Sequence, residues 1–380
     1  MTETEDAWIA LAHMVEPADP AACARIERWG PTEFLSRLQA RGTGLRHEEG
    51  MLARWSGYSA ERARERADRI GARIITRGSP EWPRQVDALG PTAPFAMWVS
   101  GAADLRLIAL RSVSIVGARA STPYGDETAR SWAAELASER WTVISGAAFG
   151  IDAAAHRGAL AAGGVTIAVV AGGVDVPYPR AHAPLLDAIV DQGLVISEVP
   201  PGESVRRQRF LSRNRIIAAL GRATVVVEAA VRSGTMATAH AASTLMRPVL
   251  AVPGPVTSPM SAGCHRMMQE GMAIVVGECA DVIAALDLSS ITQAPLTPAP
   301  GSPAQSERDA LRPGQTRVLD SMPSRGWSDA DALIRASALA PADVLAGLTE
   351  LVMLGWVEEG PLGCQLLRVP PAESGTELPR

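Results

Sequence analysis

The sequence predicts an α/β protein: an extended Rossmann-like, doubly wound sheet, flanked by a small N-terminal helical domain and a C-terminal winged-helix-like domain. Three observations predict this fold. Between residues 112 and 287, short β-rich runs alternate with alanine-rich stretches of helical spacing. Residues 1–75 show helical spacing instead. A proline-rich segment near the C-terminus precedes three helical stretches and a hairpin. The length of 380 residues also fits two or three domains.

A run of helical stretches defines the predicted N-terminal domain, residues 1–75. The stretches include residues 21–28, 31–38 and 59–70. Apolar residues recur through this segment at the spacing of a small helical core: Leu11, Ile26, Phe34, Leu38 and Ile70. We therefore expect a small domain built of helices ahead of the sheet.

The predicted Rossmann-like core covers residues 76–287. Seven β-rich runs mark its strands: 112–116, 142–145, 166–171, 194–197, 224–228, 249–252 and 273–276. Helical stretches lie between most of them, at 126–139, 152–162 and 234–245. Apolar strands that alternate with helices predict a parallel sheet covered on both faces. In such a sheet ligands bind at the carboxyl ends of the strands, so we expect a site in the loops that follow them.

Two further segments complete the chain. Residues 288–314 carry five prolines among Ser, Thr, Gln and Ala, a composition that predicts a linker. Residues 315–370 carry helical stretches and then a hairpin, which is the order found in a winged helix: helices at 316–322, 329–336 and 341–354, strands at 356–359 and 365–369.

The helix at 341–354 occupies the position with which a winged helix normally enters the major groove of duplex DNA. Here it carries Asp343 and Glu350 and no basic residue. Because binding to duplex DNA relies on cationic contacts to its phosphates, an acidic helix is repelled. We therefore expect the tail to be a protein-interaction or regulatory module.

The charged residues exclude several classes of enzyme. The net charge is −5, and the chain contains no lysine, so all 36 basic residues are arginines. A P-loop ATPase needs the lysine of its phosphate loop, and Schiff-base enzymes need a reactive lysine, so both are excluded. The negative net charge does not exclude a nucleic-acid partner, because steering depends on local clusters of charge.

The cysteines and the apolar runs limit location and cofactors. The four cysteines are scattered and form no CxxC pair, so neither a zinc site nor a disulfide framework is expected: Cys23, Cys264, Cys279 and Cys364. We expect no metal and no cofactor. No apolar run reaches the length of about 18 residues that a membrane span needs, and the acidic start lacks the features of a signal peptide. We therefore expect a cytoplasmic protein.

The loop after the first strand of the core departs from a dinucleotide-binding fingerprint. After Gly117, Arg119 takes the place of the second glycine, where a bound dinucleotide would need bare backbone. The loop can still hold an anion through Arg119, the hydroxyls of Ser121 and Thr122, and the start of the following helix. The alternative is a turn with a structural role only.

Two further loops have the composition of phosphate-binding turns. Ser145 and Gly146 follow the second strand of the core, and small residues there let backbone amides approach a phosphate. Ser233 and Gly234 open a helix after a later strand.

A possible acid–base pair follows the second of these strands. Asp152 and His156 lie four residues apart on one helix face. They could form an acid–base pair, but we favour an N-cap with a hydrogen-bonded neighbour, because no nucleophile or second base is visible nearby. We assign no catalytic residue.

The strongest local signal is a basic run at residues 206–215. Five arginines fall within ten residues, and Phe210 lies among them. Cations that follow a backbone, together with an aromatic ring for base stacking, are typical of single-stranded nucleic-acid binding. The alternative is a solvated charge run with Phe210 as a core anchor. The candidate contacts are Arg119, Arg206, Arg207, Arg209, Phe210, Arg213 and Asn214.

Several motifs of the core, in this order, resemble the DprA/Smf family of bacterial DNA-processing proteins. The resemblance covers roughly residues 78–287. Trp82 stands where the family usually has tyrosine, and residues 262–268 replace its usual Gly-Thr-Asn followed by an apolar pair. The matching motifs are Ile115-Val-Gly-Ala-Arg119, Thr122-Pro-Tyr-Gly125, Ser145-Gly146, Gly150-Ile-Asp152, Gly172-Gly-Val-Asp175, Tyr178-Pro179, Arg213-Asn-Arg-Ile-Ile217, Val227-Glu-Ala229, Ser233-Gly234 and Val252-Pro-Gly254.

The resemblance implies an extended Rossmann fold with a SAM-like N-terminal domain and a winged C-terminal domain. It implies a homodimer that binds single-stranded DNA without sequence preference and delivers it to the RecA recombinase in transformation or recombination. The family's DNA contacts correspond to Arg119, Arg207 and Phe210 of this chain.

Two other functions remain as alternatives. One is a nucleotide-binding phosphoribohydrolase of the "lonely guy" class, whose motif PGGxGTxxE ends in a catalytic glutamate. The nearest stretch here, residues 232–238, lacks the double glycine and has Thr238 in place of the glutamate. The other is a nucleotide sensor that uses the same pocket.

Overall fold

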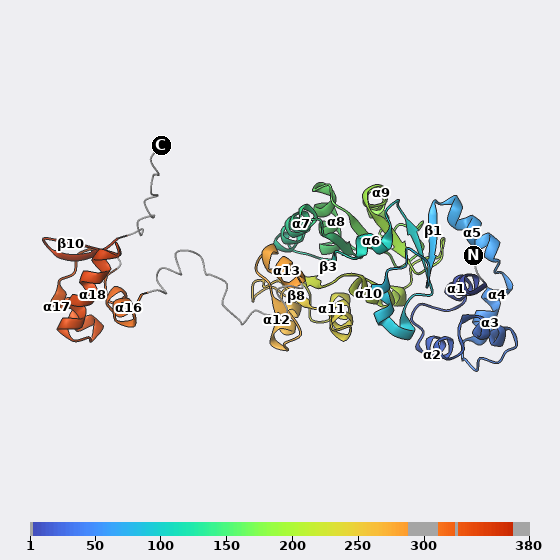
Figure 1. The fold of residues 1–380 in the computed structure, drawn as a ribbon, viewed down its shortest axis with the longest axis horizontal. Coiled ribbons are helices and arrows are strands. Elements are labelled where there is room, and N and C mark those ends of the chain that lie inside the picture. The colour runs from blue at the N-terminus through green and yellow to red at the C-terminus, as the bar shows by residue number, and fades with distance from the viewer. Residues whose placement is uncertain (1–2, 288–310, 324–325, 368–380) are drawn as a thin grey trace. The chain divides into compact units, whose positions relative to one another are not determined.

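The computed structural model describes residues 3–287, 311–323 and 326–367 (Figure 1). The chain forms two compact units, which divide between residues 293 and 294. Most of the predicted linker, residues 288–310, lies outside the described residues, as does the end of the predicted tail domain from residue 368. The boundaries predicted at residues 75, 287 and 314 stay a proposal.

Five helices begin the first unit: α1 (Glu3–Met14), α2 (Pro20–Trp29), α3 (Pro31–Gln39), α4 (Glu48–Ser56) and α5 (Ala60–Arg69). Local chemistry sets several of their starts. Asp19 caps α2 by accepting a hydrogen bond from Ala22 N at 2.8 Å, and α2 and α3 each begin with proline, which suits the first turn. These helices pack directly on the sheet, because Ile9 and Ala67 share a buried cluster with Trp98.

Nine strands form one sheet: β1 (Ala72–Thr76), β2 (Ala96–Ser100), β3 (Ser112–Val116), β4 (Thr142–Ser145), β5 (Thr166–Val169), β6 (Leu194–Ser197), β7 (Thr224–Val226), β8 (Val249–Ala251) and β9 (Ile274–Val275). Their order is β1-β2-β6-β5-β4-β3-β7-β8-β9. Strands β3 to β9 pair in parallel, whereas β1 pairs with β2, and β2 with β6, in antiparallel fashion. The predicted doubly wound α/β fold is confirmed.

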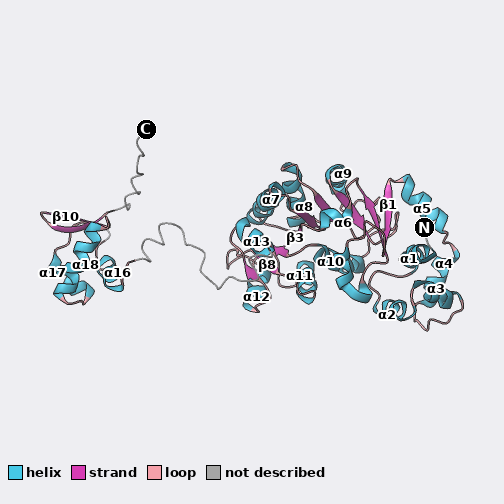
Figure 2. Ribbon diagram, viewed as in Figure 1, coloured by secondary structure: helices cyan, strands magenta, loops and turns pink. Residues whose placement is uncertain are grey.

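Helices cover both faces of this sheet (Figure 2). Strand side chains alternate between the two faces. Ile144 packs in the buried cluster that includes α10 and α11, and Val143 packs in the cluster that includes α7 and α8. The helices of this part are α6 (Leu105–Ala109), α7 (Pro123–Ser138), α8 (Ile151–Ala161), α9 (Ala183–Gln192), α10 (Arg207–Leu220), α11 (Gly234–Thr244), α12 (Ala262–Gln269) and α13 (Cys279–Leu286).

Two strands were not predicted, and one of them falls inside the segment expected to be helical. β2 is buried at every position and therefore lacks the alternation that marks a half-exposed strand. β1 is its antiparallel partner, but residues 77–95 separate the two strands. This connection is far longer than a hairpin turn, so the sequence contains no turn motif that would indicate the pairing. The sheet is therefore mixed at this edge.

The second unit contains α16 (Pro313–Asp320), α17 (Ala330–Ser337), α18 (Pro341–Met353) and the antiparallel hairpin of β10 (Val357–Gly360) and β11 (Gly363–Leu366). Val318, Leu333, Val344 and Val357 enclose its small core. Three helices and a hairpin follow the order expected of a winged helix.

No single helix of the described residues is long and apolar enough to cross a membrane. Only α17 and α18 taken together reach the required length and composition, and a bend of 112° separates them.

Candidate nucleic-acid interface

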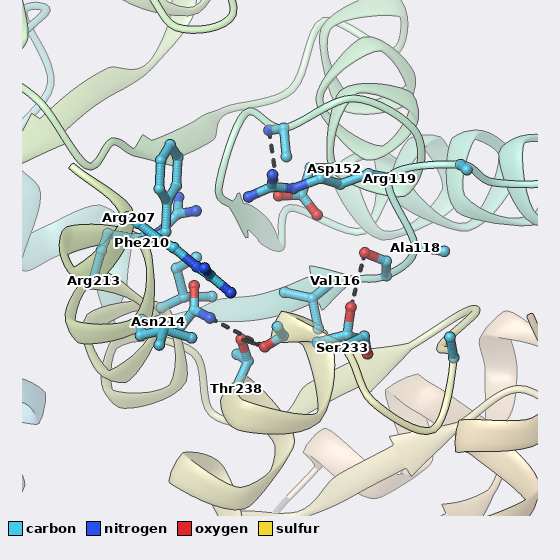
Figure 3. A pocket seen from close by; sticks show the side chains of 18 of the residues that line it. Val116, Ala118, Arg119, Asp152, Arg207, Phe210, Arg213, Asn214, Ser233 and Thr238 are labelled. Carbon is cyan, nitrogen blue, oxygen red and sulfur yellow. Dashed lines mark hydrogen bonds between the residues drawn. The ribbon is translucent and has the colours of Figure 1, made fainter. Parts of the chain in front are cut away.

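A pocket of about 770 Å³ lies at the carboxyl end of the parallel strands (Figure 3). Its walls include the loops after β3, β4, β5 and β7, one face of α10 and the first turns of α11. β4 and β7 lie on opposite sides of β3, so this is the point where the strand order of the sheet reverses. A crevice opens at such a point in doubly wound sheets, and it is where their ligands bind.

Two exposed arginines and the aromatic ring of Phe210 are among the side chains that line the pocket. Arg119 follows β3, and Arg207 and Phe210 lie on α10. The guanidinium carbon of Arg119 lies 5.1 Å from the ring centre of Phe210, which is cation–π distance. Neither Arg119 nor Arg207 forms an ion pair with a carboxylate of the described residues. Both cations are therefore available to an anionic ligand.

A buried arginine forms the floor of the pocket. Arg213 donates hydrogen bonds to the carbonyl oxygen of Gly146, at 2.8 Å, and to that of Val169. Burial lowers the pKa of Arg213 to about 10, although the nearby Asp152 carboxylate acts in the opposite direction. The side chain therefore stays charged at neutral pH, but its hydrogen bonds hold it against the protein.

In the loop after β4, a carboxylate of the protein binds the backbone amides that were expected to hold a phosphate. Asp152 accepts hydrogen bonds from the amides of Gly146 and Ala148, at 3.2 and 3.4 Å. Burial raises the pKa of Asp152, and the charge of Arg213 opposes that rise. The hydroxyl of Ser145 is buried and donates to the carbonyl oxygen of Ile115 at 2.7 Å. Ser145 and Gly146, both predicted to cradle a phosphate, therefore have partners within the protein.

The loop after β3 is held in the same way. Glu228, buried at the end of β7, accepts hydrogen bonds from the amide of Thr122 at 2.9 Å and from its hydroxyl at 2.6 Å. Ser121 donates to Asp126. The Glu228 carboxylate thus occupies the position at the start of α7 where we expected a bound anion. Of this predicted cradle, Gly117 lines the pocket and Arg119 faces it.

The start of α11 is different. Ser233 and Gly234 line the pocket, and the hydroxyl oxygen of Ser233 is buried without a hydrogen-bond partner among the described residues. Asn214 donates a hydrogen bond to the carbonyl oxygen of Gly234 at 3.1 Å and so joins α10 to this turn. Of the three loops predicted to hold phosphate, this is the one to which the described residues bring no carboxylate.

The basic run divides into paired and unpaired arginines. Arg209 is buried and donates to Glu16 and Glu203, each at 3.1 Å. Arg206 is exposed and also pairs with Glu16 at 3.1 Å. Arg215 pairs with Glu198 through two nitrogens, at 2.7 and 2.6 Å. Within the described residues, Arg207 is therefore the arginine of this run that faces the pocket without a protein partner.

Glu16 connects the N-terminal helices to α10. Besides Arg206 and Arg209, it accepts a hydrogen bond from Arg54 at 2.8 Å. Burial raises the pKa of Glu16, but the hydrogen bond from Arg209 and the charges of the three arginines outweigh burial and lower the pKa overall. This network holds the first turn of α10, which carries Arg207 and Phe210.

The structure gives no support to an acid–base pair of Asp152 and His156. The Nδ1 atom of His156 lies 2.7 Å from the hydroxyl of Thr166, away from the pocket lining. Burial lowers the pKa of His156 to about 3, so the ring is neutral. The N-cap of α8 is Gly150, so the cap predicted at Asp152 is wrong by two residues. Asp152 instead caps the preceding loop.

Three residues of this region were not predicted as part of the site. Glu228 and Glu16 hold its loops, and Tyr178 lines the pocket. A carboxylate directly after the apolar strand around Val226 could have indicated Glu228. Tyr178 belongs to a motif already noted after a strand. Glu16 has no comparable signal, since its partners lie far along the chain.

Comparisons of sequence and structure identify relatives of this chain. A family model described as DNA recombination-mediator protein A matches residues 73–287. A protein of Mycobacterium tuberculosis H37Rv that carries the name DprA is 39% identical over 370 residues, which is 93% of this chain and 92% of that protein. Protein Smf of Escherichia coli K12 is 32% identical, with 87% of each chain covered.

Two solved structures are similar. DNA processing protein A from Streptococcus pneumoniae superposes with a TM-score of 0.63 and 32% identity, covering 75% of this chain and 98% of that one. DNA processing protein A from Helicobacter pylori, whose structure concerns its single-stranded DNA binding mode, superposes with a TM-score of 0.51 and 26% identity, covering 56% and 95%.

Proposed function

Since the chain belongs to the DprA/Smf family of DNA-processing proteins, we propose that it binds single-stranded DNA, without sequence preference, in the pocket at the reversal point of the sheet. The observation that carries this proposal is the arrangement of Arg119, Phe210 and Arg207 around one concave surface. Unpaired cations attract phosphates, and the face of an aromatic ring stacks on any base.

The proposal favours a single strand over a duplex for a physical reason. Stacking on Phe210 requires a free base face, and the bases of a duplex present only their edges in the grooves. A concave wall that carries two cations and an aromatic ring suits a flexible strand. The contacts that we propose are Arg119, Arg207 and Phe210. Arg206 is a secondary contact because Glu16 competes for it, while Arg209, Arg213 and Asn214 support the wall.

We further propose that the protein acts without catalysis and passes its DNA to RecA in the cytoplasm. Among the residues that line the pocket, Asp152 is the acidic one, and loop amides already hold its carboxylate. Thr238, where a phosphoribohydrolase would carry its glutamate, offers only a hydroxyl. The family resemblance is the ground for the transfer to RecA.

We also propose a homodimer. The sheet ends at β9, where Ile274 and Val275 are both exposed. An exposed apolar edge strand pairs readily with another chain, so a dimer would cover it. The variant Ile274→Arg should then sediment as a monomer, and an unchanged sedimentation coefficient would contradict this edge as the interface.

The test of the main proposal is a binding titration with single-stranded and duplex oligomers of equal length across a salt series. We expect tight single-strand binding that weakens as salt rises, because binding releases counterions. Nucleoside monophosphates serve as competitors. If they bind and the oligomers do not, the nucleotide sensor is the better account. If the monophosphate is hydrolysed, the protein is an enzyme.

A further inference from the structure

Exposed aromatic side chains gather beside the pocket. Phe149 is 49% exposed and Tyr178 is 45% exposed, whereas Phe34 and Phe95 are buried in the N-terminal core. Phe149 lies in the loop after β4 and Tyr178 in the loop after β5, and these two strands are neighbours in the sheet. Both rings therefore stand at the same edge as Phe210. Large rings left in water at a ligand-binding edge indicate a surface that a partner covers.

The contacts of these rings place Tyr178 against Phe210 and Phe149 next to a residue of the pocket lining. The ring centre of Tyr178 lies 5.3 Å from that of Phe210, with the ring planes at 55°, and Tyr178 lines the pocket. Phe149 packs against His182 with ring centres 4.6 Å apart. Ala148, directly before Phe149, lines the same pocket.

The support beneath Phe149 is rigid. His182 is buried, and its Nδ1 atom lies 3.0 Å from the carbonyl oxygen of Ala147, in the loop that carries Phe149. The edge contact with His182 thus holds the Phe149 ring from below while half of its surface faces water. A fixed ring loses little conformational freedom when a base stacks on it.

Basic side chains accompany this row of rings. Arg119 stacks on Phe210, and Arg207 lines the same wall. Arg180 follows Tyr178 by two residues, is exposed, and makes no ion pair with a carboxylate of the described residues. Alternation of cations with aromatic rings is the pattern that binds a single strand through both its phosphates and its bases.

We propose that Tyr178 and Phe149 continue the stacking surface that begins at Phe210, so that the bound strand runs from the Arg119–Arg207 wall over the loops after β5 and β4. Each ring takes one base, and Arg180 contacts a phosphate between them. This inference rests on the proposed function. It adds a path for the bound strand over the protein surface and two further base-stacking positions.

The test compares alanine variants on oligothymidylates of two lengths, about 4 and about 12 nucleotides, a range typical of single-strand sites. Tyr178→Ala should weaken binding of the longer oligomer by about 5- to 150-fold, the equivalent of one stacked base, without changing the salt dependence. Tyr178→Phe keeps the ring and should bind like the wild type. Phe149→Ala should weaken only the longer oligomer.

The matched control is Tyr124→Ala. Tyr124 is 46% exposed, on α7 outside the pocket lining, and its hydroxyl donates to the carbonyl oxygen of Pro253 at 2.8 Å. This variant should leave affinity unchanged. A longer oligomer of abasic nucleotides provides the second readout. Without bases to stack, the Tyr178→Ala and wild-type proteins should bind it equally, because the substitution then removes no stacking contact.

Two results would overturn the inference. One is a Tyr178→Ala affinity within twofold of the wild type on the longer oligothymidylate. The other is an equal loss on abasic and normal strands, which would show that the ring supports the fold instead. Failure of the proposed function looks different, since the wild type would then bind neither oligomer and Arg207→Glu would change nothing.

Discussion

The pocket of the large sheet and helix α18 of the tail both occupy positions where their folds commonly meet a ligand or nucleic acid. Their side chains differ completely. The pocket offers Arg119, Arg207 and exposed rings, whereas α18 offers Asp343 and the exposed apolar side chains Leu345 and Met353. The comparison teaches that a position in a fold does not by itself make a surface bind DNA. The charges and aromatic rings of the side chains at that position determine whether it can.

An arginine that contacts α18 sharpens this contrast. Arg312 pairs with Glu350, which also accepts a hydrogen bond from Gln315 at 2.7 Å. The cation therefore neutralises the helix and does not extend toward a phosphate. In the pocket the opposite holds, because Arg119 and Arg207 keep their charge free while paired arginines support them from behind.

The largest expected effect is charge reversal at the pocket wall. Arg207→Glu or Arg119→Glu should weaken single-stranded DNA binding by at least about tenfold, because each loses a charge-assisted hydrogen bond and adds repulsion. Fluorescence anisotropy with a labelled oligothymidylate measures this.

Arg140→Glu is the matched control for these variants. It makes the same change of net charge at an exposed position just before β4, at the amino ends of the strands and therefore opposite the pocket. Equal weakening by the control would mean that net charge, and not the pocket, sets the affinity.

The next effect concerns Phe210. Phe210→Ala should weaken binding by roughly 1–3 kcal/mol while the salt dependence stays nearly constant, since stacking releases no counterions. Binding and thermal unfolding should be measured on the same sample. A melting temperature lowered by several degrees would identify Phe210 as a core residue and remove it from the binding surface.

A smaller change in DNA affinity is expected when an ion-paired arginine is replaced. Arg209→Ala should change affinity by less than about fivefold, but it should lower the free energy of unfolding by about 1–3 kcal/mol, because it leaves Glu16 and Glu203 without their buried partner. Urea denaturation measures the stability. A large loss of affinity with normal stability would place Arg209 on the DNA.

The same network predicts a pH dependence. Because the pKa of Glu16 is lowered overall in the folded protein, its contribution to stability is fully present above its ordinary pKa and is lost as the pH falls through the lowered pKa. The stability difference between the wild type and Glu16→Gln should therefore shrink in acid. A difference that stays constant down to low pH would contradict the ionised network.

The smallest effect is expected from the tail. Deletion of residues 313–380 should leave single-stranded DNA affinity within about threefold, or roughly 0.7 kcal/mol, because α18 presents no cation to the strand. A tenfold loss in a truncated protein of unchanged oligomeric state would show that the tail contacts DNA.

Much of the fold could be predicted because the seven parallel strands are apolar runs with clear boundaries. The strand β2 could not, since its burial on both faces and its distant partner β1 leave no periodic signal. In the site, Arg119, Arg207 and Phe210 were predicted as contacts, and the structure brings them to one wall. Their role in binding stays a prediction.

The carboxylates that close the loops were beyond the reach of the sequence. Thr122 and Glu228 lie 106 residues apart, and Arg209 and Glu16 lie 193 apart. Which carboxylate accepts from which donor depends on the order of the strands in the sheet, and local sequence composition does not determine that order. For this reason the sequence predicted anion cradles in the loops after β3 and β4, where the carboxylates of Glu228 and Asp152 already bind the loop amides.

The measurement that tests the central claim most directly is the salt dependence of oligothymidylate binding by the wild type and by the double variant Arg119→Gln/Arg207→Gln. Each phosphate contact contributes about 0.7 to the slope of log affinity against log salt for a single strand. The account predicts that the double variant binds more weakly and that its slope is smaller by about 1.4. A slope equal to that of the wild type would contradict it.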